Sequence, residues 1–181
     1  LQEATSVMSR LVEEIRDGAL RLRMVPIGET FNRFQRVVRD VGRELGKEIE
    51  LVINGADAEL DKSVVEKIGD PLMHLVRNAI DHGIEHAGKR LAAGKPETGR
   101  IWLNAYHEAG SVVIEVADDG AGLNRDAILA KAIANGLVSE DSLLNDRDIY
   151  RLVFEAGFST AEQVTSISGR GVGMDVVRKA I

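Results

Sequence analysis

Apolar residues recur at intervals of three and four over the first part of the chain, and this spacing predicts helices. The apolar positions of the first stripe are Met8, Leu11, Ile15, Leu22 and Val25. Because Pro26 disfavours helical backbone in the residue before it, we expect this helix to end there. A second stripe over residues 31–45 predicts another helix, terminated by Gly46. Residues 26–30 are therefore expected to form a hinge between the two helices.

The next part of the chain combines a strand pattern with a long helix pattern. Residues 48–53 are β-like and end at a turn signal at residues 54–55. Ser63, followed three residues later by a glutamate, forms a capping-box pattern that predicts the start of a helix reaching about His82. Pro71 lies inside this stretch, and either a kink or a restart of the helix is expected there.

The second half of the chain begins with two short strand patterns and continues with helices. Residues 100–107 and 111–117, joined by a tight turn, predict an antiparallel hairpin. Asn124 is expected to cap the helix that follows it. The helices expected after the hairpin cover residues 125–135, 147–156 and 174–181. This order of helices and antiparallel strands indicates the α+β class, with one sheet covered by helices on one face.

Composition and charge narrow the class of protein. Hydrophobic residues make up 44% of the 181 residues and charged residues 29%, which is typical of a globular domain in water. The apolar runs are far shorter than the ~20 residues that cross a bilayer, so we expect no membrane insertion. A net charge of −6 argues against nucleic-acid binding, and the absence of cysteine excludes disulfides and thiolate metal sites. A cytoplasmic location fits this composition.

Three polar residues, His74, Asn78 and His82, recur at intervals of four within the long helix pattern. At this spacing they share one face of a helix, so an imidazole and an amide can converge on one ligand. The amide oxygen of Asn78 suits Mg²⁺ that bridges phosphates, and a nearby histidine could orient or deprotonate an attacking group. Ordinary core or surface histidines would show the same spacing, and the triplet alone leaves both interpretations open.

A second candidate site follows the strand pattern at residues 111–117. Asp118 stands where this strand is expected to end, and a carboxylate there can accept a hydrogen bond from an exocyclic amine. Gly120 and Gly122 let the backbone turn sharply and approach a planar ring closely. An ordinary Asp-Gly turn has the same composition, so a turn and a binding loop both remain open.

A glycine-rich segment, residues 169–173, precedes the last expected helix. Backbone N–H groups at the start of a helix can bind a phosphate chain. The polar residues before this segment do not match the buried strand of a dinucleotide fingerprint, and the chain has no P-loop sequence. Residues 157–168 contain few apolar anchors and are expected to form a lid over the site.

The order of these features is more specific than any one of them. An Asn-bearing helix, a strand ending in Asp-x-Gly-x-Gly, a lid and a Gly-x-Gly-x-Gly segment resemble the ATP-binding fold shared by histidine kinases, DNA gyrase, Hsp90 and MutL. Residues 74–85, 158–160 and 168–176 are similar to the N, F and second glycine boxes of the chemotaxis histidine kinases, the CheA family. Residues 23–27 resemble the junction with the dimerisation helices of that family. The resemblance implies a two-layer α/β sandwich of the Bergerat type with a mixed, mostly antiparallel sheet.

The resemblance also implies roles for individual residues. Asn78 would bind Mg²⁺, Asp118 would contact the adenine of ATP, and His74 would serve phosphoryl transfer rather than hydrolysis. Lys131 would contact a phosphate, although a solvated helix face explains it equally well. The other residues implied in ATP binding are Arg77, His82, Gly120, Gly122, Ser159, Gly169, Arg170, Gly171, Val172, Gly173 and Met174.

The activity implied by the resemblance is that of a protein-histidine kinase. The γ-phosphoryl group of ATP would pass to a histidine on a separate phosphotransfer domain and from there to a response regulator. The four histidines of the chain include none in the acceptor setting that ordinary sensor kinases carry on a dimerisation helix, which agrees with a separate acceptor domain. An ATP hydrolase of the gyrase or Hsp90 kind and a docking module without turnover are the alternatives.

The family pattern further implies how the chain is divided and what it meets. Residues 1–27 would form the end of a dimerisation helix and a hinge, and residues 28–181 the catalytic domain. The final sheet strands of the family domain are expected to be absent, since the chain stops at Ile181. A coupling protein, a chemoreceptor and a second copy in a homodimer are the other implied partners.

Overall fold

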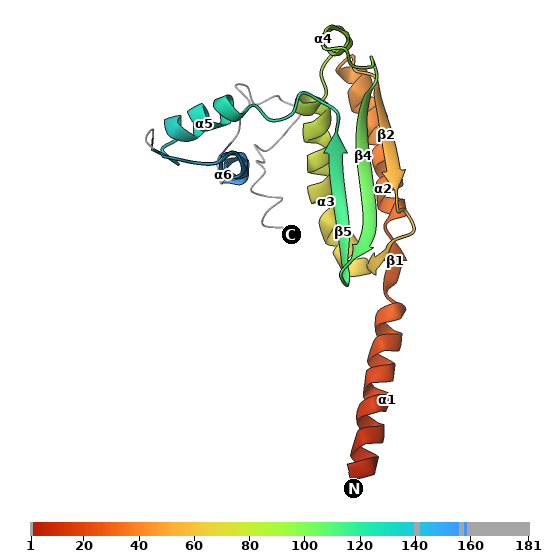
Figure 1. The fold of residues 1–181 in the computed structure, drawn as a ribbon. Coiled ribbons are helices and arrows are strands. Elements are labelled where there is room, and N and C mark those ends of the chain that lie inside the picture. The colour runs from red at the N-terminus through yellow and green to blue at the C-terminus, as the bar shows by residue number, and fades with distance from the viewer. Residues whose placement is uncertain (1, 140–141, 156–157, 159–181) are drawn as a thin grey trace.

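In the computed structural model, residues 2–139, 142–155 and 158 are described. The N-terminal helix α1 (Gln2–Arg21) extends away from the rest of the molecule as an arm (Figure 1). The expected lid, apart from residue 158, and the expected last helix lie outside the described residues.

The segment that follows the arm is anchored rather than open. Strand β1 (Met24–Pro26) pairs antiparallel with β3 (Glu59–Asp61), a short strand that the sequence pattern does not indicate. Ile27 is fully buried, and the backbone N–H of Ile27 donates to the carbonyl of Ala58 at 2.9 Å. Strand pairing and burial therefore anchor the start of this segment, and the hinge expected at residues 26–30 stays a prediction. Helix α2 (Gly28–Glu44) begins within it.

A three-stranded sheet forms the centre of the fold. Its order is β2-β4-β5, where β2 (Ile49–Asn54) runs parallel to β4 (Gly99–Glu108) and β4 runs antiparallel to β5 (Ser111–Asp118). The predicted hairpin is confirmed. Its turn is closed by Ala109 and Gly110, whose φ angles of 48° and 81° place both in the left-handed region.

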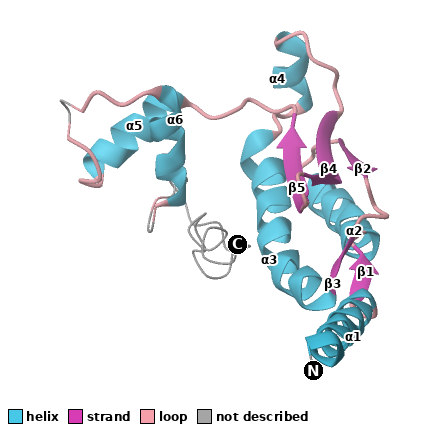
Figure 2. Ribbon diagram, turned by 60° about the horizontal axis from the view of Figure 1, so that its bottom comes forward, coloured by secondary structure: helices cyan, strands magenta, loops and turns pink. Residues whose placement is uncertain are grey.

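Two helices cover one face of this sheet. Helices α2 and α3 (Lys62–Asn78) lie side by side behind the strands, which gives the two layers seen in Figures 1 and 2. Along β4, Ile101, Leu103 and Ala105 are buried while the residues between them are more exposed. This alternation points one side of the strand into the helices. The expected α+β sandwich with a mixed sheet is confirmed.

Helix α3 begins and continues differently from the expectation. Its N-cap is Asp61, whose Oδ1 accepts from the backbone N–H of Ser63 at 2.8 Å, so Ser63 is not the capping residue. Asp61 also ends β3, and the strand pairing fixes where the helix starts. Pro71 does not restart the helix, since α3 continues through it from Lys62 to Asn78. Pro71 is buried, and packing of this face offsets the missing hydrogen bond.

The remaining helices are short. Helix α4 (Ala87–Ala92) precedes β4, and α5 (Arg125–Ala134), α6 (Asp146–Arg151) and the 3-10 turn at Leu152–Phe154 form a separate lobe (Figure 2). The predicted cap of α5 is confirmed, since Asn124 Oδ1 accepts from the N–H of Ala127 at 3.0 Å. The helix expected at 147–156 ends earlier, at Arg151. This lobe has its own small core, formed by Ile128, Ala132, Ile149 and Phe158. No helix in the described ranges is long and apolar enough to span a bilayer.

Candidate functional site

A pocket of about 1010 Å³ lies between α3, β5, the loop after β5 and the lobe of α5 and α6. Its walls are mainly apolar and come from two sides, α3 with β5 on one side and the lobe on the other. The polar side chains among its lining residues are those of Asn78, His82, Asp118 and Asn124. A cavity of this size with few, convergent polar groups is typical of a small-molecule site.

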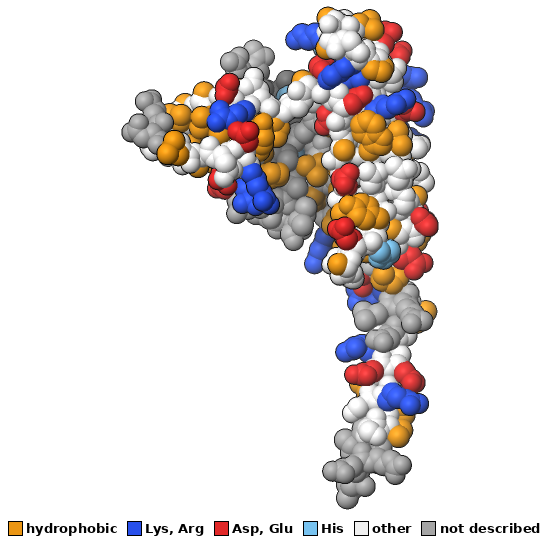
Figure 3. Space-filling model, in the orientation of Figure 1, with side chains coloured by type: hydrophobic (Ala, Val, Ile, Leu, Met, Phe, Trp, Pro, Cys, Tyr) orange, Lys and Arg blue, Asp and Glu red, His pale blue; other side chains and the backbone are white. Residues whose placement is uncertain are grey.

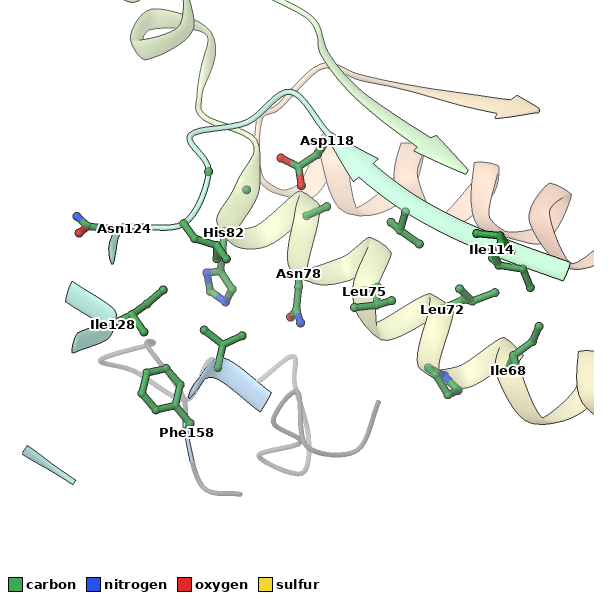
Figure 4. Close-up of a pocket in the computed structure, with 18 of the residues that line it drawn as sticks. Ile68, Leu72, Leu75, Asn78, His82, Ile114, Asp118, Asn124, Ile128 and Phe158 are labelled. Atoms are coloured by element: carbon green, nitrogen blue, oxygen red, sulfur yellow. The ribbon is translucent and has the colours of Figure 1, made fainter. Parts of the chain in front are cut away.

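The wall that carries Asn78 and His82 contains a change of helix type. After α3 the chain forms a π-helical turn (Ala79–Gly83), in which the N–H of Ile84 donates to the carbonyl of Ala79 at 2.8 Å. Such turns inside helices are frequent at functional sites. Asn78 and His82 project from the same side of this element toward Ile128 and Phe158 across the pocket (Figure 4).

A buried lysine holds the π-turn from behind. Lys47 Nζ donates to the carbonyls of Ile80 at 2.7 Å and Asp81 at 3.0 Å, so two carbonyls of the turn are satisfied by one side chain. Burial lowers the pKa of Lys47, while the negative charges of Asp81 and Glu85 act in the opposite direction. Lys47 therefore fixes the backbone that presents His82 to the pocket.

Asp118 stands at the C-terminal end of β5, where its side chain is exposed toward the pocket. The backbone N–H of Gly120 donates to Asp118 Oδ1 at 2.9 Å and so orients the carboxylate. Gly122 also lines the pocket, and its φ of 74° is a conformation that glycine adopts without strain. The loop thus combines a fixed carboxylate with backbone that turns tightly.

The loop after β5 touches the π-turn at two glycines. The N–H of Ala121 donates to the carbonyl of Gly83 at 2.9 Å. A Cβ at position 120 would overlap that same carbonyl, and a Cβ at position 83 would lie 3.1 Å from Asp118 Oδ1. The two pocket walls therefore meet through a contact that excludes side chains, and this contact sets Asp118 relative to the helix of Asn78.

A fully buried arginine secures the loop from the opposite side. Arg90 forms an ion pair with Asp119. One guanidinium nitrogen donates to Oδ2 at 2.8 Å and a second donates to Oδ1 at 3.1 Å. Arg90 also donates to the carbonyl of Pro96 at 2.7 Å and pairs with Glu85 at 3.2 Å. The hydrogen bond to Asp119 raises the pKa of Arg90, so the guanidinium stays charged despite its burial.

The carboxylates in this network are held ionised. A hydrogen bond from Lys95 lowers the pKa of Glu85, and the charge of Arg90 lowers it further. Burial acts in the opposite direction but is outweighed. Burial raises the pKa of Asp119, but hydrogen bonds from the Arg100 backbone N–H and from Arg90 outweigh it and the pKa is lowered. Lys95 joins Glu85 to the loop, since its Nζ contacts Glu85 at 2.7 Å and the carbonyl of Gly120 at 2.8 Å. Below, Glu85, Arg90, Lys95 and Asp119 are called the loop clamp.

The structure brings part of the predicted site together. Asn78, His82, Asp118 and Gly122 line the pocket. Gly120 lies behind the wall at the contact with Gly83. The predicted residues that are half-buried and do not line the pocket are His74, Arg77 and Lys131. Those that lie outside the described residues are Ser159, Gly169, Arg170, Gly171, Val172, Gly173 and Met174.

Sequence reasoning did not find Lys47 or the loop clamp. The composition of residues 85–99, rich in Gly, Lys and Ala, predicts a short helix within a loop and gives no sign of a buried charge. Arg90 instead is fully buried, and its main partner is 29 positions later in the chain. The only local signal was the charge of Glu85, Arg90 and Lys95, which does not distinguish a buried network from a solvated face.

The pocket suits a planar ligand with a polar edge. Apolar side chains of α3 and β5 can cover the faces of a ring, while Asp118 accepts a hydrogen bond at its edge. No group of three or more His, Cys, Asp or Glu side chains within the described part of the chain could hold a metal ion by itself. The amide oxygen of Asn78 fits the family of sites in which Mg²⁺ has one or two protein ligands and phosphate oxygens.

Comparison with known proteins agrees with this geometry. "Chemotaxis protein CheA" of Listeria monocytogenes and of Bacillus subtilis are each 51% identical to the chain over its whole length. "Sensor histidine kinase CheAY" of Helicobacter pylori is 48% identical, again over the whole chain. The chain spans 30%, 27% and 23% of the lengths of these three relatives.

Similarity to a solved structure and to a family model completes the comparison. The histidine kinase domain of the blue-light activated kinase EL346 from Erythrobacter litoralis has a TM-score of 0.41 and 18% identity, and covers 71% of this chain and 54% of its own. The model of the family "Histidine kinase-, DNA gyrase B-, and HSP90-like ATPase" matches residues 67–181, which is more than half of the chain and includes Asn78 and Asp118. The chain therefore belongs to the histidine kinase-, DNA gyrase B- and HSP90-like ATPase family.

Proposed function

We propose that this chain is the ATP-binding catalytic domain of a chemotaxis-type protein-histidine kinase. In this role it binds Mg-ATP and transfers the γ-phosphoryl group to a histidine of a separate phosphotransfer domain, which then supplies a response regulator. The observation that carries the proposal is the convergence of Asn78 and Asp118 on one pocket from two walls that meet at Gly83 and Gly120. Similarity to CheA proteins over the whole chain supports the same function.

Three polar residues of the pocket, and His74 on α3 outside it, receive distinct tasks. Asp118 accepts a hydrogen bond from the exocyclic amine of adenine, because a carboxylate held by the Gly120 N–H is an oriented acceptor. Asn78 holds Mg²⁺, which neutralises charge on the phosphates when it is bound. His82 lies beside Asn78 in the pocket wall (Figure 4), and we assign it to the phosphates. His74 precedes Asn78 by one turn on α3 and would assist the phosphoryl transfer.

The phosphoacceptor is assigned to another domain. The four histidines of the chain are His74, His82, His86 and His107. None lies on α1, the element that we assign to the dimerisation helix. His107 is followed by a glutamate but belongs to β4, near the hairpin turn. The proposed reaction therefore needs a phosphotransfer domain of the same chain or of a partner chain, and positioning of the two reactants supplies most of the acceleration.

The surroundings of this domain follow from the same proposal. We place it in the cytoplasm, in a homodimer that works with a coupling protein and a chemoreceptor. Residues 1–27 form the end of the dimerisation helix and a hinge, and residues 28–181 the catalytic domain. The segments 157–168 and 169–173, which apart from residue 158 lie outside the described residues, are assigned as lid and phosphate loop, and Lys131 is a candidate phosphate contact.

Nucleotide binding to the Asp118→Asn variant tests the proposed function. The variant is expected to bind ATP at least about tenfold more weakly, because an amide presents the wrong group to the adenine amine. Asp57→Asn is the matched control, since Asp57 is exposed in a turn and does not line the pocket. Equal ATP affinities for the wild type and Asp118→Asn would refute the adenine role.

Transfer to an added phosphotransfer domain tests the reaction itself. The wild-type protein is expected to pass radiolabelled γ-phosphate from ATP to a histidine of that domain. Release of free phosphate at the same rate without the acceptor domain would instead assign the chain to the ATP hydrolases of the family. Binding of ATP with neither outcome would make it a docking module without turnover.

A further inference from the structure

We propose that Lys95 is a positioning residue for nucleotide recognition, which holds the carboxylate of Asp118 in the orientation that accepts the adenine amine. The inference rests on the proposed function of Asp118 and extends it to a residue that lies outside the pocket. Lys95 does not line the pocket, so it acts through the loop rather than on the ligand.

A continuous series of hydrogen bonds joins Lys95 to Asp118. Lys95 Nζ donates to the carbonyl of Gly120 at 2.8 Å and to the carbonyl of Asp119 at 3.1 Å. The N–H of Gly120 in turn donates to Asp118 Oδ1 at 2.9 Å. Lys95 therefore holds the two peptide groups that decide where the Gly120 N–H points, and this N–H sets the carboxylate.

The position of Lys95 is itself fixed by an ion pair. Its Nζ lies 2.7 Å from Glu85 Oε1, and the Glu85 side chain is only 15% exposed. Glu85 also pairs with Arg90, which is fully buried and bonded to Asp119. Within this clamp, Arg90 stabilises the fold of residues 85–99 as well as the loop, because it also bonds the carbonyls of Pro96 and Thr98.

Lys95 and Arg90 both donate to the carbonyl of Asp119, but Lys95 is more exposed and also bonds the carbonyl of Gly120. The Lys95 side chain is 33% exposed, and the loop atoms it contacts are backbone carbonyls. Its removal therefore leaves the ion pairs between Arg90 and its two carboxylate partners in place. A substitution of Lys95 can therefore loosen the loop without disrupting the buried contacts of Arg90, so Lys95 is the better position for testing the role of the loop.

The loop is held between two supports at Gly120. On one side the glycine packs against the carbonyl of Gly83, and on the other its own carbonyl accepts from Lys95. The hydrogen bond from the Gly120 N–H uses Asp118 Oδ1. The second oxygen, Oδ2, bonds no donor in the described part of the chain and is available to a ligand amine. Without Lys95, the carbonyl of Gly120 loses this donor and the carbonyl of Asp119 keeps only the 3.2 Å bond from Arg90, so the Gly120 N–H and the carboxylate it orients are held less firmly.

Affinities for ATP and ITP distinguish this role from general stabilisation. ITP carries a carbonyl in place of the exocyclic amine, so it does not use the hydrogen bond of Asp118. In the intact protein, Lys95→Met is expected to weaken ATP binding about five- to tenfold while ITP binding changes less than about twofold. Lys95→Arg, which keeps a donor of the same charge, is expected to restore most of the ATP affinity. All affinities are measured by competition against a fluorescent nucleotide, at a temperature below the melting temperature of each variant.

Three further measurements complete the experiment. Lys89→Met removes the same charge from an exposed position on α4 and is expected to bind both nucleotides like the wild type. In an Asp118→Asn background, Lys95→Met is expected to add no further loss of ATP affinity. Unchanged ATP affinity in Lys95→Met, or equal losses for ATP and ITP, would overturn the positioning role while leaving the proposed function intact. Wild-type ATP affinity in Asp118→Asn would instead overturn the proposed function from which the inference starts.

Discussion

The carbonyl of Gly83 occupies the space where a side chain at Gly120 would begin. This contact joins the π-turn that presents His82 to the loop that presents Asp118, and the N–H of Ala121 reinforces it with a 2.9 Å bond to the same carbonyl. The distance between the two polar walls of the pocket therefore depends on two residues that carry no functional group. Glycine is required at position 120 for close approach and not for a positive φ angle, since Gly120 is not among the positive-φ glycines.

Replacing Gly120 with alanine tests this contact. The added methyl group must displace the π-turn or the loop, and we expect a loss of about 1–3 kcal/mol in the free energy of unfolding. ATP affinity is expected to fall as well, because Asp118 moves with the loop. Gly88→Ala is the matched control, since a Cβ there meets nothing within 4 Å. Urea unfolding and nucleotide titration of both variants check the prediction, which fails if Gly120→Ala matches Gly88→Ala.

The Glu85 carboxylate is expected to make stability depend on acid pH. The hydrogen bond from Lys95 lowers the folded-state pKa of Glu85 below its ordinary value of 4.5. The stabilisation is therefore complete above that ordinary value and is lost as pH falls through the lower, folded-state pKa. Glu85→Gln is expected to cost about 1–2 kcal/mol at neutral pH and progressively less in acid.

Denaturant unfolding over a pH series measures this difference. Glu50→Gln serves as the control, because the Glu50 side chain is 53% exposed and pairs with Arg100 at the surface. Its effect is expected to stay small at every pH. A cost of Glu85→Gln that does not shrink in acid would show that the carboxylate charge is not what stabilises the clamp.

Much of the fold could be predicted because its signals are local. The hairpin of β4 and β5 follows from two strand patterns around a tight turn, and the cap at Asn124 from a single side chain. The pairing of β1 with β3 could not, because both strands have three residues and their alternation is too short to detect. The same pairing anchors the chain next to Ile27, which is fully buried within the expected hinge.

The site shows the same division between local and tertiary information. Helical spacing and a strand end lead to Asn78, His82 and Asp118, which all line the pocket. The burial of Arg90 depends on Asp119 and Glu85 folding around it, and composition gives no sign of this. The π-turn behind His82 depends likewise on Lys47, 33 positions before its carbonyl partner Ile80.

Lys47 is expected to make stability depend on pH in the alkaline range. The cause is burial of the amine, whereas for Glu85 it is a hydrogen bond. Burial lowers its folded-state pKa below the ordinary value of 10.5, so the unfolded chain binds more protons between the two values. The contribution of Lys47 to stability therefore increases as pH rises from the folded-state pKa toward that ordinary value. The neutral amine still has two hydrogens for the carbonyls of Ile80 and Asp81.

Comparison of the wild type with Lys47→Met isolates this effect. The wild type is expected to gain stability relative to the variant as pH rises, and the variant is expected to bind nucleotide more weakly at every pH because the π-turn loses its support. Lys89→Met, which changes an exposed lysine, is the control and is expected to show neither effect. A constant difference between wild type and Lys47→Met across the pH series would contradict the assignment.

Asn78 is expected to determine the dependence on Mg²⁺. Asn78→Asp adds a negative charge beside the phosphates, and we expect phosphotransfer to fall at least about a hundredfold with a changed Mg²⁺ requirement. Asn32→Asp is the matched control at an exposed position of α2. Single-turnover transfer measured over a range of Mg²⁺ concentrations checks this, and retained turnover with an unaltered requirement would refute the metal role.

The arm of α1 is expected to mediate self-association. Met8, Leu11, Val12 and Ile15 recur at helical spacing, and Met8 and Ile15 are 68% and 71% exposed. Hydrophobic side chains stand among charged ones on this arm (Figure 3), a pattern that is stable in water when a second helix covers it. Ile15→Glu places a charge in this stripe and is expected to shift the protein to monomers, whereas Ser6→Glu on the opposite face is not. Sedimentation equilibrium at several concentrations measures both variants, and identical dimer dissociation constants would assign the contact to another surface.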